Sequence, residues 1–247
     1  MSSRPLTFRD RSLITAVIAF IIVFVIWNIP FFSFLLYPFR LFVTFIHESG
    51  HGLASIATGG EFLRFEVFDS GAGLALTRGG NPAFVLPAGY LGAAAFGAGL
   101  FYLAHTIRHT RGISIALGAI LALITILYTG LLSPNFSATA FFVGLLMSGL
   151  LIFIGRRADQ DVNLLVLNIL AMLTSLHAVL DLIYLVSNSG VGLGQLRNDA
   201  FVFSREVAPI LPPAGWAARW ALLAVIMLGA SVYYSLIRPR RQRPLRI

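Results

Sequence analysis

Cysteine is absent from the 247-residue chain. Disulfide bonds, thiolate metal ligands and a cysteine nucleophile are therefore excluded. Lysine is absent as well, because all 18 basic residues are arginine. A metal site in this protein would have to draw on its five histidines and ten acidic residues.

Charged residues are scarce at 11% of the chain, whereas hydrophobic residues make up 57%. This balance excludes an ordinary soluble globular protein and favours a membrane protein. Several apolar runs reach the roughly 20 residues that a helix needs to cross about 30 Å of hydrocarbon. We therefore expect an integral, multi-pass protein of the cell membrane.

The arginines lie mainly at the ends of the apolar runs, and five of them fall between Arg238 and Arg246. A net charge of +8 could indicate nucleic-acid binding in another protein, but here no soluble basic face exists to carry it. The anionic surface of the lipid bilayer is the better partner for these residues, and no nucleic acid is expected.

The apolar runs predict an all-α polytopic membrane protein with six or seven transmembrane helices. We treat residues 1–247 as one integral-membrane domain that ends in a basic tail at 238–247. Seven segments are long enough to span, at about 12–29, 33–58, 83–105, 112–131, 137–155, 162–186 and 216–237.

The charge distribution leaves the orientation open at this point. Seven crossings would put the N-terminal and C-terminal arginines on opposite sides of the membrane, although both clusters should favour the cytoplasm. Either one of the segments does not cross, or one of the clusters departs from the rule.

Two stretches interrupt the apolar pattern. In residues 61–78, alternating apolar and polar side chains flank the turn sequence Asp69-Ser70-Gly71 and predict a β-hairpin. Its edge amides need partners, so it should lie at the membrane interface or be covered by protein. Residues 187–215 carry several glycines and the breaker Pro212-Pro213, and they predict a flexible loop.

The second segment carries the sequence His47-Glu48-Ser49-Gly50-His51, an HExxH motif. Pro38 predicts that its regular helix begins near Phe39, and Gly59-Gly60 should end it. On a helix, residues i and i+4 share a face, so His47 and His51 can bind one zinc ion. Glu48 can then contact a metal-bound water as the general base.

A catalytic zinc needs a third protein ligand, because such sites usually hold three ligands and one open position. Asp181 is the best candidate, since it is the only acid besides Glu48 well inside a predicted membrane segment. His177, four residues earlier on the same helical face, is the alternative ligand or a partner that orients Asp181.

These sequences resemble the site-2 protease family of intramembrane zinc metalloproteases. The resemblance lies in Phe45 to Gly52, in Leu180-Asp181, in the hairpin after the motif, and in Ala88 to Gly92. It implies two histidine ligands and one distal aspartate. The chain has no room for an accessory peptide-binding domain, so it is most similar to the smaller branch of the family.

The resemblance implies a zinc-dependent endopeptidase that cleaves peptide bonds in or near the membrane segments of protein substrates. Two other functions stay open. A non-catalytic metal-binding or metal-transporting protein would use His47, His51 and Asp181 but would not need Glu48. A haem protein would need His105 or His177 as an axial partner, because two ligands at i and i+4 cannot bind opposite faces of one haem.

Overall fold

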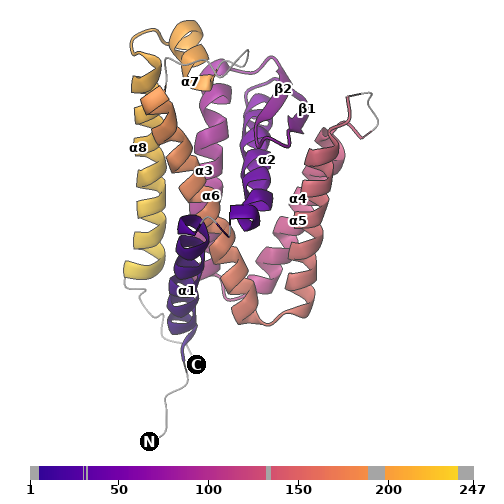
Figure 1. Ribbon diagram of the computed structural model, residues 1–247, viewed down its shortest axis with the longest axis vertical. Helices are drawn as coiled ribbons and strands as arrows, with labels where there is room; N and C mark the ends of the chain where they lie inside the picture. Colours follow the sequence, from indigo (N-terminus) through magenta and orange to yellow (C-terminus); the bar gives the residue numbers. More distant parts are fainter. Residues whose placement is uncertain (1–5, 30, 32, 132–134, 189–197, 239–247) are drawn as a thin grey trace, which may run out of the picture.

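The computed structural model describes residues 6–29, 31, 33–131, 135–188 and 198–238. They form a helical bundle with one small antiparallel sheet (Figure 1). The predicted fold class is thereby confirmed. The elements are α1 (Phe8–Asn28), α2 (Ser33–Ala57), β1 (Glu61–Val67), β2 (Gly73–Arg78), α3 (Pro82–Thr106), α4 (Thr110–Tyr128), α5 (Ala138–Arg157), α6 (Gln160–Asn188), α7 (Asp199–Val202), the π-helical turn η2 (Phe203–Val207), α8 (Pro213–Val232) and a second π-helical turn, η3 (Tyr233–Ile237).

Six helices in the described part of the chain are long and apolar enough to cross a membrane, namely α1, α3, α4, α5, α6 and α8. The protein is therefore a multi-pass membrane protein. The motif helix α2, which corresponds to the predicted segment at 33–58, is not one of them. Its length of 25 residues suffices, but Arg40 and the ionisable side chains of the HExxH motif lower its hydropathy.

Helix α2 begins at Ser33, earlier than the predicted start near Phe39, and it contains Pro38. The proline removes one backbone hydrogen bond in the second turn without ending the helix. The predicted end of the helix is confirmed, because Gly59 adopts a φ of 84° directly after α2. Glycine enters this left-handed conformation without the steric cost of a β-carbon.

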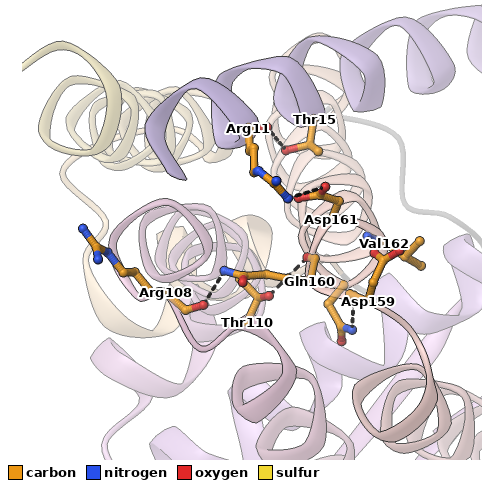
Figure 2. Close-up of polar contacts among 9 residues, drawn as sticks. Arg11, Thr15, Arg108, Thr110, Asp159, Gln160, Asp161 and Val162 are labelled. Atoms are coloured by element: carbon orange, nitrogen blue, oxygen red, sulfur yellow. Dashed lines mark hydrogen bonds and ion pairs between the residues drawn. The ribbon is translucent and has the colours of Figure 1, made fainter. Parts of the chain in front are cut away.

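The start of α1 and the end of α8 lie at the same end of the bundle (Figure 1). The guanidinium of Arg9 donates to the carbonyl oxygen of Leu236 at 2.7 Å. At this end Arg11 also pairs with Asp161, at the start of α6, at 2.9 Å (Figure 2). Six spanning helices thus place the described flanking residues Arg9, Arg11 and Arg238 on one side, whereas seven crossings would put the two termini on opposite sides.

The predicted β-hairpin is confirmed, and it runs alongside α2. Its turn is held near the middle of that helix, where Thr44 Oγ1 donates to the carbonyl oxygen of Gly71 at 2.7 Å. Its open end lies near Ser55, which donates to the carbonyl oxygen of Glu61 at 3.2 Å. A bulge between Phe62 and Arg64 shifts the alternation, so Phe62 is buried and Leu63 is exposed.

The predicted loop at 187–215 is partly helical. Helix α6 extends to Asn188, and α7 and η2 occupy residues 199–207. Residues 189–197 of this stretch, like 239–247 of the predicted basic tail, lie outside the described residues. Helix α7, within the predicted loop, lies at the same end of the bundle as the hairpin (Figure 1).

Candidate metal centre

His47 and His51 occupy successive turns of α2, and their Nε2 atoms are 3.0 Å apart. Nδ1 of His51 lies 2.7 Å from the carbonyl oxygen of Val85, in α3. A carbonyl oxygen only accepts, so Nδ1 carries the proton and Nε2 of the neutral ring presents its lone pair. This contact from α3 orients His51 as a ligand.

Asp199, the first residue of α7, completes a group of three. Its Oδ2 lies 3.4 Å from Nε2 of His51 and 3.7 Å from Nε2 of His47. No other group of three or more His, Cys, Asp or Glu side chains close enough to hold a metal occurs among the described residues.

The three ligand atoms fit zinc in chemistry and in spacing. Zinc accepts imidazole nitrogen and carboxylate oxygen at about 2.0–2.1 Å in tetrahedral geometry, which separates neighbouring ligand atoms by about 3.3 Å. The observed separations of 3.0, 3.4 and 3.7 Å bracket that value. Three ligand atoms that converge in this way can hold one cation between them.

The electrostatic setting of Asp199 favours the form that binds metal. Burial would raise the pKa of its carboxyl group, but the adjacent His51 and His47, when protonated, lower it below the ordinary value, and a bound cation would supply the same positive charge when the imidazoles are neutral. Asp199 therefore stays ionised.

Asp199 is held by a cap and by aromatic packing. Asn198 precedes α7 and accepts a hydrogen bond from the backbone N–H of Phe201 at 2.8 Å. Phe203 is 6% exposed, and its ring makes edge contacts with Trp216 and Trp220 at centroid distances of 4.7 and 5.4 Å. These contacts fix the short helix against α8.

Helix α3 approaches the metal centre closely because of Gly89. A β-carbon at this position would overlap Nε2 of both His47 and His51. On α2, between the two histidines, a β-carbon on Gly50 would overlap the carbonyl oxygen of Ala88. Glycines at both contact points let the two helices pack backbone to backbone. The next residue, Tyr90, packs edge-on against His47 with ring centroids 4.5 Å apart.

Glu48 is 6% exposed and faces the hairpin. A β-carbon on Gly73 would overlap the Glu48 carboxylate, and the backbone of Ala75 interacts with the same group. The general base predicted from the motif therefore lies between the two histidines and strand β2.

The outer edge of β2 is turned toward Glu48. The N–H of Phe68 donates to the carbonyl oxygen of Ala72 at 2.9 Å, which makes that pair a hydrogen-bonded one. Pairs alternate along an antiparallel ladder, so the polar groups of Gly73 and Ala75 point away from β1. Consistently, the N–H of Val67, opposite Gly73, leaves the sheet and donates to Ser137 Oγ at 3.3 Å. In the described part of the chain, no strand pairs with this edge of β2.

The structure places the other predicted site residues on α6. Asp181 is exposed and lies within electrostatic range of His177, His47 and Arg40, but it is not part of the three-residue group. His177 packs against Trp27 at a ring-centroid distance of 4.8 Å and contacts the carbonyl oxygen of Leu173 at 3.0 Å. The structure thus brings His47, Glu48 and His51 together with Asp199, and it leaves Asp181 and His177 outside the ligand cluster.

The sequence reasoning missed Asp199 because this residue follows a glycine-rich stretch without helical periodicity. One local signal was available. Asn198 followed by an acidic residue and the run Ala200 to Val202 fits the start of a helix, with an N-cap and a negative charge in the first turn.

Comparison with known proteins identifies the family to which the site belongs. The family model described as Peptidase M50B-like matches residues 14–231, which is most of the chain. No curated protein and no solved structure matches. The matched region contains the HExxH motif, the hairpin, Asp181 and Asp199.

Proposed function

Since the chain belongs to the Peptidase M50B-like family, we propose that it is a zinc-dependent endopeptidase that hydrolyses peptide bonds in or near the membrane segments of protein substrates. Membership confirms the resemblance to the site-2 proteases. The observation that carries the proposal is the convergence of His47, His51 and Asp199 at separations of 3.0 to 3.7 Å, with Glu48 on the turn between the histidines.

The proposed zinc ligands are His47, His51 and Asp199. Asp199 replaces Asp181 as the third ligand in this proposal, because its carboxylate lies within 3.7 Å of both imidazoles. Asp181 would instead border the site from α6, within electrostatic range of His47, and His177 would pack beside it against Trp27. When bound, zinc would supply a Lewis acid for the scissile carbonyl and lower the pKa of water to about 7.

Glu48 is positioned to move the protons of the reaction. Its carboxylate accepts a proton from the attacking water and passes it to the nitrogen of the scissile bond, so that the C–N bond breaks and an amine leaves. The low exposure of Glu48 excludes bulk water from this transfer. His51 is held in its ligating tautomer by the carbonyl of Val85, and this contact keeps the site preorganised.

The open edge of β2 offers a means of holding substrate. A peptide bond within a helix is already hydrogen-bonded, so the substrate segment has to unwind before cleavage. An extended peptide can add to the edge of a sheet through main-chain hydrogen bonds. The outward N–H and carbonyl of Gly73 and the outward carbonyl of Ala75 supply such an edge directly beside Glu48, which accepts from the Ala75 backbone.

The experiment that tests the proposal compares the wild type with Glu48→Gln in liposomes that contain a panel of single-span peptides. Both proteins should bind zinc, whereas cleavage by Glu48→Gln should fall by about 100-fold or more. Products are detected by mass spectrometry. Equal cleavage by both proteins would contradict the proposed role of Glu48. Zinc binding without cleavage by the wild type would favour the metal-binding alternative.

A further inference from the structure

The two ends of the bundle differ in charge. The arginine-rich end comprises the start of α1, the α3–α4 and α5–α6 connections and the end of η3. Its described charged residues are Arg9, Arg11, Arg108, Arg111, Arg156, Arg157 and Arg238, against Asp10, Asp159 and Asp161. Arginine therefore exceeds acid at this end by four.

The opposite end, which we call the site end, holds the hairpin, α7, η2 and the start of α8 (Figure 1). Acids and arginines nearly balance there. Ion pairs join Arg64 to Glu66 and Arg78 to Glu61. The other two described arginines stack on aromatic rings, Arg205 over Phe201 and Arg219 over Trp216. The site end thus has no excess of positive charge among its described residues. The charged residues counted are Arg64, Arg78, Arg205 and Arg219 against Glu61, Glu66, Asp69, Asp199 and Glu206.

Polar contacts link several elements of the arginine-rich end. Figure 2 shows Arg11 pointing to Asp161 and the side chain of Gln160 pointing to the carbonyl oxygen of Arg108. The hydroxyl of Thr110 donates to the carbonyl oxygen of Gln160 at 3.3 Å. These contacts join α1, the α3–α4 connection and α6 at this end of the bundle.

The metal centre lies close to the site end. Gly89, which touches both ligand imidazoles, is seven residues from the start of α3 at Pro82 and 17 residues from its end at Thr106. At 1.5 Å per residue these positions are about 10 Å from the site end and about 25 Å from the arginine-rich end. The site therefore belongs to one half of the membrane.

We infer that the arginine-rich end docks on the anionic headgroups of the cytoplasmic leaflet and that the metal centre opens toward the opposite side of the membrane. Excess arginine in short loops stays cytoplasmic and is attracted to anionic lipid. On the proposed function, which this step requires, the substrate is the non-cytoplasmic end of a spanning segment. The bond that is cut lies about 10 Å inside that boundary.

The absence of cysteine from the chain permits a direct test by single-cysteine labelling. His109→Cys places a thiol in the exposed α3–α4 connection, and Ile210→Cys places one at the site end, where Ile210 is 75% exposed. In intact cells a membrane-impermeant maleimide should label Ile210→Cys fully and His109→Cys only after the membrane is opened. The reverse pattern, or labelling of both variants in intact cells, would overturn the inference.

The labelling also separates this inference from the proposed function. It needs neither zinc nor turnover, so the same pattern is expected when Glu48→Gln is added to each variant. If the labelling holds and the wild type cleaves the single-span peptides, the cut should map to the half of the peptide on the site-end side. Cuts in the half next to the arginine-rich end would refute the substrate assignment while leaving the peptidase proposal intact.

Discussion

The backbone of Gly89 lies directly against the imidazole of His51, so closely that a β-carbon on Gly89 would overlap its Nε2 atom. The same β-carbon would also overlap Nε2 of His47. Helix α3 therefore forms one wall of the metal centre without supplying a ligand side chain. The site depends on the absence of a side chain there as much as on its three candidate ligands.

Gly89→Ala should lower zinc affinity on the order of 100-fold, because the new methyl group displaces both imidazoles. The measurement is competition for zinc against a chromophoric chelator. Gly99→Ala is the matched control, since it lies on the same helix and its β-carbon would meet no atom within 4 Å. Normal zinc affinity in Gly89→Ala would show that the close contact between α3 and the two imidazoles is not required for zinc binding.

Asn198→Ala should weaken zinc binding about tenfold by loosening α7, which carries Asp199. Thr7→Ala is its control, because Thr7 caps α1 at the other end of the bundle. Each variant loses about 1 kcal/mol of helix stability. Zinc titration of the two proteins should show a loss only in Asn198→Ala, and an equal loss in both would mean that the cap acts through general stability.

Ala75→Pro should slow cleavage of the single-span peptides at least about tenfold while zinc binding is retained, because it removes the outward N–H of β2, which donates to Glu48 and would border an added strand. Ala75→Ser keeps that N–H and should retain activity. The equivalent change at Phe65 is a poorer probe, since Phe65 is fully buried in β1 and packs on Phe45. Full activity of Ala75→Pro would remove the strand-addition step from the account.

The sequence predicts most of the fold because its signals are local. Apolar runs, the turn at Asp69 to Gly71 and the stop at Gly59 each depend on neighbouring residues, and the observed helices begin and end within a few residues of the predicted positions. The bulge that exposes Leu63 and the continuation of α2 through Pro38 depend instead on packing. Such tertiary effects are not encoded in periodicity.

The histidine pair was predictable because four residues separate His47 and His51 on one helix. The position of Asp199 beside this pair was not, because it depends on where a distant segment folds back. Asp181 satisfies the expectation for an acid within an apolar run. Asp199 is brought to the histidines by the packing of Phe203 on Trp216 and Trp220, and such a contact between distant segments leaves no spacing pattern in the sequence.

Zinc content of the purified wild type, Asp199→Ala and Asp181→Ala tests the central claim most directly. The three-ligand site of His47, His51 and Asp199 predicts about one zinc per chain in the wild type and in Asp181→Ala, and a loss of zinc in Asp199→Ala. Circular dichroism should confirm that all three proteins remain folded. Full zinc in folded Asp199→Ala together with its loss from Asp181→Ala would contradict the account and return the third ligand to α6.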